Sequence, residues 1–222
     1  MKKFALIVAG GSGTRMKSDV PKQFIEIAGL PVIMHTINTF EKFEPEFEFI
    51  LVLPESQISN WHLLCKKHLF NIKHKIAFGG ATRFYSVKNG LNLIEDEGIV
   101  FIHDAVRPLV SDATIQNCLD CAITKGNALP VISVTDSARI VDGDKNRPAD
   151  RSQIYLVQTP QTFQTSLIKN AYQITRTDNF TDDATVLEST GATINLVEGN
   201  RENIKITTPA DLIIAEAFFK MK

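Results

Sequence analysis

The chain has 222 residues, of which 44% are hydrophobic and 22% charged, with 24 Lys and Arg set against 25 Asp and Glu. This length and apolar content suit one domain with a substantial core and exclude a disordered chain. The net charge of −1 argues against a partner that is nucleic acid or a membrane surface. No apolar run reaches the length of a membrane span, and three cysteines are too few for a disulfide framework, so we expect a cytoplasmic protein.

The first half of the chain alternates apolar runs of strand length with amphipathic runs of helix length, which is typical of a mostly parallel α/β sheet. We expect strands at residues 4–8, 49–53, 75–78 and 99–102, of which the first and the last are apolar enough to be buried. Glycines at residues 10–16 predict a loop after the first strand. Three helices are expected in this half. The first has the apolar stripe Ile33, Ile37 and Phe40, the second is a less regular pattern over residues 56–69, and the third has the stripe Phe84, Val87, Leu91 and Ile94.

The second half continues the same alternation. Its pattern predicts helices at residues 112–124 and 165–175, and strands at residues 128–134, 154–157, 193–197 and 203–206. A short helix is expected to be capped by Thr181 and ended by Gly191. The last helix begins with Thr208 as its cap and Pro209 at its first position.

Residues 135–153 interrupt this alternation with a polar segment that contains the turn-forming run VDGDKNRP. A stretch of this length without a core pattern is typical of a functional excursion from a compact domain. We therefore expect residues 1–222 to form a single domain, from which residues 135–153 protrude as an extended hairpin arm.

Three polar clusters follow expected strands, at residues 10–22, 79–86 and 103–108. Ligands of an open parallel sheet bind beyond the carboxyl ends of its strands. The three clusters therefore predict one common site.

The first cluster has the composition of a phosphate-binding loop. Gly10, Gly11 and Gly13 allow the backbone to approach a phosphate closely, and Arg15 and Lys22 add two positive charges. The run is neither a Walker A loop nor the dinucleotide fingerprint, because Met16 stands where the fingerprint needs its third glycine. The sequence therefore predicts a triphosphate site of another type.

The run GGSGTRM followed by PKQF resembles nucleotidyltransferases that move a nucleoside monophosphate from an NTP onto a phosphorylated acceptor. The ordered runs GGATRFYSV, HDAVRP, DRSQIYLVQTPQTF, FTDDA and EGNRENIKITTPADL resemble the 2-C-methyl-D-erythritol 4-phosphate cytidylyltransferase family of isoprenoid biosynthesis, over residues 4–219. The resemblance implies a Rossmann-like, mostly parallel sheet flanked by helices, of the nucleotide-diphospho-sugar transferase type. It also implies a homodimer in which the arm reaches the second subunit.

The resemblance implies roles for residues at matching positions. Those expected to bind CTP are Ala9, Gly10, Gly11, Gly13, Gly80, Ala81 and Ser86. Those expected to bind the acceptor are Asp104, Arg107, Ser137, Arg151 and Thr181. The catalytic cations would be Arg15, Lys22, Arg151 and Lys205, and Asp104 is the expected contact of a Mg²⁺ held mainly by the CTP phosphates.

These residue types suit the transfer of CMP from CTP to 2-C-methyl-D-erythritol 4-phosphate. The acceptor's phosphate oxygen would attack the α-phosphorus and expel pyrophosphate, which leaves 4-diphosphocytidyl-2-C-methyl-D-erythritol. A phosphate dianion needs neither a protein nucleophile nor a general base, so catalysis would consist of positioning and charge neutralisation. Mg²⁺ keeps most of its waters and needs few carboxylates.

Two other functions fit part of the pattern. A cytidylyltransferase acting on ribitol 5-phosphate would share the glycine loop, PKQ and HDAVRP. A non-catalytic sensor would bind CTP without transfer, but it has little need of both Arg151 and Lys205. The role of His103, structural or catalytic, stays open, and the Cys118–Cys121 spacing favours one packed helix face over a metal site.

Overall fold

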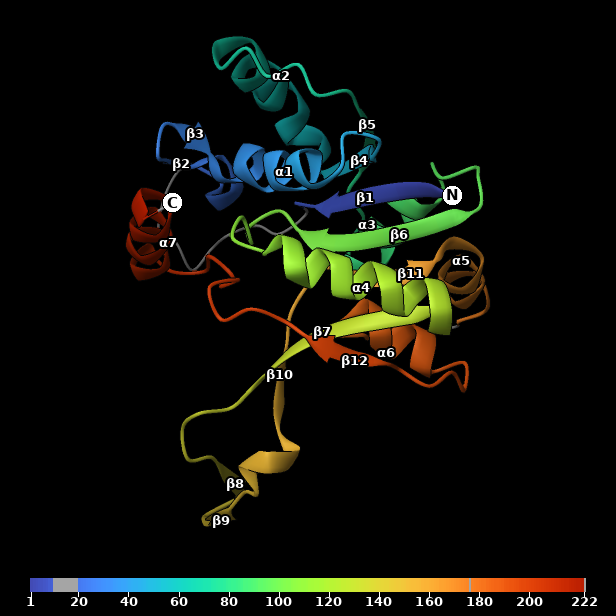
Figure 1. The fold of residues 1–222 in the computed structure, drawn as a ribbon, viewed down its shortest axis with the longest axis vertical. Helices are drawn as coiled ribbons and strands as arrows, with labels where there is room; N and C mark the ends of the chain where they lie inside the picture. Colours follow the sequence, from blue (N-terminus) through green and yellow to red (C-terminus); the bar gives the residue numbers. More distant parts are fainter. Residues whose placement is uncertain (10–19, 176, 222) are drawn as a thin grey trace.

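The computed structural model describes residues 1–9, 20–175 and 177–221. An eight-stranded sheet crosses the molecule in the order β10-β7-β11-β6-β1-β4-β5, with β12 paired to β7 (Figure 1). Its strands are β1 (Lys2–Val8), β4 (Glu48–Leu53), β5 (His74–Phe78), β6 (Gly98–Asp104), β7 (Asn127–Ser133), β10 (Tyr155–Val157), β11 (Gln161–Gln164) and β12 (Leu196–Glu198).

Strands β5, β4, β1 and β6 run parallel at the centre of the sheet. The residues of β4, β1 and β6 are mostly buried, because helices cover both faces of the sheet, whereas β5 lies at the edge and is more exposed. In β1, Ala5 and Ile7 pack into the core on one face and Phe4 and Leu6 into the core on the other. The four strands predicted in the first half of the chain are confirmed.

The helices lie in two layers. On one face are α1 (Val32–Phe43), α2 (Ile58–Lys67) and α4 (Asp112–Lys125), and on the other are α3 (Arg83–Leu91), α5 (Thr165–Ile174) and α6 (Asp183–Glu188). The last helix, α7 (Pro209–Met221), packs beside the small hairpin of β2 (Glu26–Ile27) and β3 (Leu30–Pro31). The predicted Rossmann-like fold, a mostly parallel sheet flanked by helices, is confirmed.

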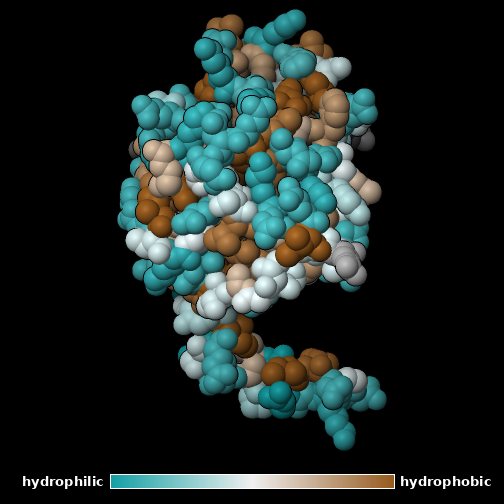
Figure 2. Space-filling view, turned by 90° about the vertical axis from the view of Figure 1, so that its right-hand side faces the viewer, coloured by the Kyte–Doolittle hydropathy of each residue, from teal (hydrophilic) through white to brown (hydrophobic). Residues whose placement is uncertain are grey.

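The predicted hairpin is present as β8 (Arg139–Asp142) paired antiparallel with β9 (Lys145–Pro148). Gly143 in its turn has φ +56°, a backbone conformation that glycine adopts without steric cost. Figures 1 and 2 show this arm projecting well beyond the body, with the hairpin at its far end.

Three predictions for the second half need correction. Residues 203–206 are not a strand: of this segment, Ile206 donates a backbone hydrogen bond to the Val106 carbonyl at 2.9 Å. Strand β12 begins at Leu196, three residues later than expected. The cap of α6 is Asp182 rather than Thr181, because the Asp182 carboxylate accepts a hydrogen bond from the Thr185 amide at 2.8 Å.

Strand β11 was not expected from the sequence, since its four residues are mostly polar and too short for a clear alternation. It lies antiparallel between β6 and β7 and joins the parallel half of the sheet to the half that bears the arm. Within the described parts of the chain, no helix combines the length and apolarity needed to span a membrane.

Candidate active site

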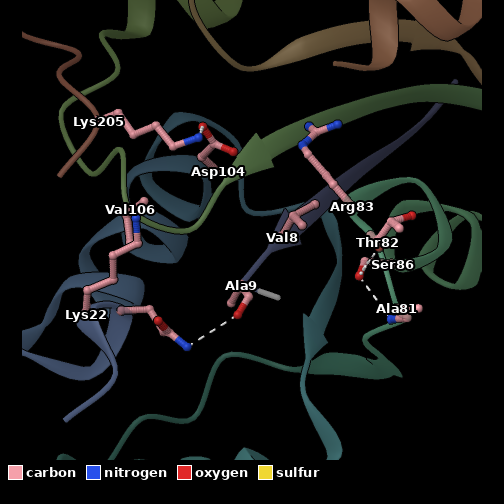
Figure 3. A pocket seen from close by; sticks show the side chains of 12 residues that line it. Val8, Ala9, Lys22, Ala81, Thr82, Arg83, Ser86, Asp104, Val106 and Lys205 are labelled. Carbon is pink, nitrogen blue, oxygen red and sulfur yellow. Dashed lines mark hydrogen bonds and ion pairs between the residues drawn. The ribbon is translucent and has the colours of Figure 1, made fainter. Parts of the chain in front are cut away.

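A pocket of about 440 Å³ opens where β1 and β6 end, beside the start of α3 (Figure 3). The segments that line it are far apart in sequence, as the expected convergence at strand ends requires. The lining residues are Val8, Ala9, Lys22, Gln23, Gly80, Ala81, Thr82, Arg83, Ser86, Asp104, Val106 and Lys205.

One wall of the pocket is the loop between β5 and α3. The Ser86 hydroxyl accepts a hydrogen bond from the Gly80 amide at 3.0 Å and donates one to the Thr82 carbonyl at 2.9 Å. Thr82 caps α3 by accepting from the Tyr85 amide. A Cβ atom at Gly80 would lie 2.3 Å from the Cβ of Tyr85, so this position requires glycine. The loop is thus held tightly against the first turn of α3.

The opposite wall is built around Asp104, whose carboxylate follows the buried run of β6. Its Oδ2 atom lies 3.0 Å from Lys205 Nζ and 3.2 Å from Arg107 Nε. Burial alone would raise the pKa of Asp104, but the positive charges of Lys205, Arg83 and Arg107 outweigh burial and hold that pKa below its usual range. Asp104 is therefore a carboxylate at neutral pH and fixes the direction of Lys205.

Lys22 enters the pocket from the short 3-10 helix Lys22–Phe24. Its Nζ atom donates to the Ile206 carbonyl at 3.2 Å, next in the chain to Lys205. The Gln23 amide donates to the Ala9 carbonyl at 3.3 Å, which ties this helix to the end of β1. Two lysines from opposite ends of the chain thus face one cavity (Figure 3).

His103 lies behind the pocket and is fully buried. Its Nε2 atom is 3.0 Å from the Arg107 carbonyl, so this nitrogen carries the proton, and Nδ1 accepts from the Thr159 hydroxyl at 3.0 Å. Burial lowers the pKa of His103 to about 4. Both ring nitrogens are engaged by the protein, so the role left open by the sequence is structural.

The structure brings most of the expected residues together. Of those predicted to act at the site, the pocket is lined by Ala9, Lys22, Gly80, Ala81, Ser86, Asp104 and Lys205. Arg107 supports Asp104 from outside the lining and donates to the Asn203 carbonyl at 2.7 Å. Gly10, Gly11, Gly13 and Arg15 lie outside the described residues.

Three expected acceptor contacts are not in this pocket. Ser137 and Arg151 lie on the arm segment, where the Arg151 guanidinium donates to the Thr135 carbonyl at 2.6 Å. Thr181 is exposed just before α6. A site that used the two arm residues would have to be completed by the arm of another subunit.

Arg83 is the pocket cation that sequence reasoning missed. It follows the expected cytosine loop directly, but its role depends on an ion pair with Asp183, one hundred residues away. The run GGATR was the available signal for a cation at the site, because its arginine directly follows the glycine loop and is the first residue of α3.

The chain is similar to one family of known proteins over nearly its whole length. The family model described as 2-C-methyl-D-erythritol 4-phosphate cytidylyltransferase (IspD) matches residues 4–221. The enzyme of that name from Bacteroides fragilis is 50% identical over 217 residues, which cover 98% of this chain and 99% of the relative. One from Phocaeicola vulgatus is 50% identical over 216 residues, covering 97% of this chain and 99% of the relative.

A solved structure shows the same likeness at lower sequence identity. The 2-C-methyl-D-erythritol 4-phosphate cytidylyltransferase from Thermus thermophilus is 30% identical and superposes with a TM-score of 0.82, covering 99% of this chain and 100% of the other. The similarity therefore extends over the whole chain, arm included.

Proposed function

The chain belongs to the 2-C-methyl-D-erythritol 4-phosphate cytidylyltransferase family, and from this premise we propose how its own residues carry out the reaction. The chain is a nucleotidyltransferase that transfers CMP from CTP to 2-C-methyl-D-erythritol 4-phosphate in isoprenoid biosynthesis. The observation that carries the proposal is the convergence of Lys22, Lys205 and the Gly80 loop on one pocket.

We assign the base of CTP to the wall formed by Gly80, Ala81 and Ser86. Supporting this assignment, all three residues line the pocket, and the bond from the Gly80 amide to Ser86 together with the close packing of Gly80 against Tyr85 makes this wall rigid. The triphosphate then extends toward Ala9 and Lys22. Gly10, Gly11, Gly13 and Arg15, which lie outside the described residues, remain its expected partners from the sequence. We assign the acceptor to the region beyond Asp104, with Arg107 and Thr181 as its expected contacts.

In the proposed reaction, an oxygen of the acceptor's phosphate forms a bond to the α-phosphorus while the bond to the β-phosphate oxygen breaks. Pyrophosphate leaves on the side opposite the attack. Lys22 and Lys205 neutralise the charge that gathers on the phosphoryl oxygens, and Asp104 keeps Lys205 aimed at them. No proton has to be removed from the attacking dianion, which agrees with a neutral, fully engaged His103.

We propose that Mg²⁺ accompanies the nucleotide. Among the described residues, Asp104 is the one acidic side chain lining the pocket, and no group of three potential ligands occurs. This donor set fits a cation that is held mainly by phosphates and water, with Asp104 as its carboxylate. When bound, Mg²⁺ would add positive charge to that of the two lysines and so help to neutralise the phosphates.

We further propose that the protein works as a cytoplasmic homodimer in which residues 135–153 reach the partner's pocket. The arm and the strand β10 at its base expose large apolar side chains, Ile140, Val141, Tyr155, Leu156 and Val157, and Figure 2 shows hydrophobic residues along the projecting arm. Exposed apolar side chains gathered in this way mark an interaction surface. Arg151 and Ser137 would then act on the partner's acceptor.

Mixing two inactive variants tests the arm's role. Arg151→Ala chains keep Lys22, and Lys22→Ala chains keep Arg151, so a hybrid dimer contains one complete site. We expect about a quarter of wild-type activity after subunit exchange of equal amounts, since half the dimers are hybrids and one of their two sites is intact. If exchange is verified and activity does not return, each site is built from a single chain.

The acceptor is tested by measuring pyrophosphate release with CTP, Mg²⁺ and either of two polyol phosphates. We expect faster turnover with 2-C-methyl-D-erythritol 4-phosphate than with ribitol 5-phosphate. Faster turnover of ribitol 5-phosphate would reverse the choice of acceptor. Binding of CTP without pyrophosphate release from either acceptor, at every Mg²⁺ concentration, would identify a sensor instead.

A further inference from the structure

Arg83 forms a bidentate ion pair with Asp183 at the edge of the pocket. Its two terminal nitrogens donate to the two carboxylate oxygens of Asp183, at 2.7 and 2.6 Å. Asp183 is fully buried, whereas 28% of the Arg83 side chain stays exposed to the pocket. A planar, bidentate pair of this kind fixes both partners in direction as well as distance.

The environment of Asp183 makes this pair rigid. The buried Tyr172 hydroxyl donates to the same carboxylate at 2.7 Å. The backbone amides of Asp183 and Ala184 both donate to the side-chain oxygen of Gln161, at 2.9 and 2.8 Å. The first turn of α6 is therefore anchored to β11 on one side and to Arg83 on the other.

The pair connects two loops that have different tasks in the proposed reaction. Arg83 is the first residue of α3 and follows the loop assigned to cytosine, in which Ser86 bonds the Gly80 amide. Asp183 begins α6, two residues after Thr181, the expected acceptor contact. Figure 3 shows the Arg83 side chain extending from the α3 loop toward the end of β6, across from Lys205.

We propose that Arg83 is a positioning residue that couples two loops: the nucleotide loop between β5 and α3, which contains Gly80, and the acceptor loop before α6, which contains Thr181. A bound cytosine would then set the position of Thr181. This inference rests on the proposed function, because it uses the roles assigned to the two loops. The geometry of the guanidinium carries the coupling, since its two terminal nitrogens each bond one carboxylate oxygen of Asp183. A lysine at position 83 would keep the charge but lose the two-point contact.

Hydrogen exchange on the wild-type protein tests the coupling without a variant. We expect CTP to slow exchange of the amides at residues 80–86 and also at residues 181–188. Protection at 80–86 without protection at 181–188 would overturn the coupling while leaving the proposed nucleotide site intact. Absence of protection at 80–86 would contradict the nucleotide site itself, and the coupling with it.

Arg83→Lys provides the kinetic test. A displacement of about 1 Å in a positioned group can reduce a rate about a hundredfold, so we expect kcat/KM for the acceptor to fall by about that factor. CTP affinity should change by less than about threefold, and CTP should no longer protect residues 181–188. Near-normal acceptor kinetics in this variant would show that a charge alone suffices and would refute the proposal.

Lys88→Gln is the matched control, because Lys88 lies on the same helix α3 but outside the pocket. We expect it to keep wild-type kinetics and the protection at residues 181–188. Circular dichroism of each variant establishes that it is folded, and if Arg83→Lys does not fold, the exchange experiment on the wild-type chain decides. A loss of acceptor kinetics in Lys88→Gln equal to that in Arg83→Lys would assign the effect to α3 in general and overturn the proposal.

Discussion

Two adjacent glycines offer a sharp test of the nucleotide loop, because the structure tolerates a methyl group at one and not at the other. A Cβ atom added at Gly80 would lie 2.3 Å from the Cβ of Tyr85 and 2.9 Å from its backbone carbon. These atoms belong to the first turn of α3 and cannot swing aside as the end of a flexible side chain could. At Gly79, the nearest atom is the Leu53 carbonyl oxygen at 3.5 Å, an ordinary van der Waals contact.

Gly80→Ala should therefore introduce strain of about 2 kcal/mol, the middle of the range for an overpacked site. The strain can be relieved only if residues 80–82 move away from α3, which breaks the hydrogen bond from the Gly80 amide to Ser86. If this loop holds cytosine, the same strain appears as a loss of CTP affinity of about thirtyfold. Gly79→Ala should change that affinity by less than a factor of about three.

The assay is titration of CTP by calorimetry, with thermal unfolding of each variant measured in parallel. We expect Gly80→Ala to raise the Kd for CTP about thirtyfold while the unfolding midpoint falls by only a few degrees. If Gly80→Ala binds CTP as tightly as the wild type does, the base does not lie against this loop. An equal loss in Gly79→Ala would show that the effect comes from backbone stiffening and not from contact with α3.

Two further predictions concern the opposite wall of the pocket. Lys205→Ala should lower kcat/KM about a hundredfold in steady-state kinetics, as expected for one lost transition-state cation. The midpoint of thermal unfolding should change little, because the Lys205 side chain is partly exposed. Burial lowers the pKa of His103 to about 4 in the folded chain, so the unfolded chain, with a pKa of about 6.5, binds more protons between these values. The contribution of His103 to the free energy of unfolding should therefore be fully present above about pH 6.5 and fall by about 3 kcal/mol as the pH drops to about 4. Urea unfolding at several pH values measures this dependence. If the dependence is unchanged in a His103→Gln variant, other groups cause it.

The sequence predicts the parallel half of the sheet well for a physical reason. Strands buried on both faces show a short uninterrupted apolar run, such as Ile99–Ile102 in β6, and its length and flanking turn residues distinguish it from a helix. The strand predicted at residues 203–206 was wrong because alternation of polar and apolar residues also occurs in an irregular segment, here one whose amides bond to nearby carbonyls and to Val106 instead of a strand ladder. Strand β11 was missed because antiparallel pairing on both sides stabilises a polar run that has little signal of its own.

Part of the candidate site, like part of the fold, could be predicted from the sequence. Asp104 and the Gly80 loop were predictable, because polar residues after buried strands converge at one edge of a parallel sheet. The direction of Lys205 could not be predicted, since it depends on a carboxylate about a hundred residues earlier. The same holds for the pairing of Arg83 with Asp183, which only the packing of α3 against α5 and α6 brings about.

The most direct test of the proposed site is a structure of the protein with CTP and Mg²⁺ bound. It should show cytosine against Gly80 and Ser86, the triphosphate beside Lys22, and Lys205 within reach of the α-phosphate. A nucleotide bound elsewhere on the molecule, or one whose base points away from the Gly80 loop, would contradict the assignment of this pocket.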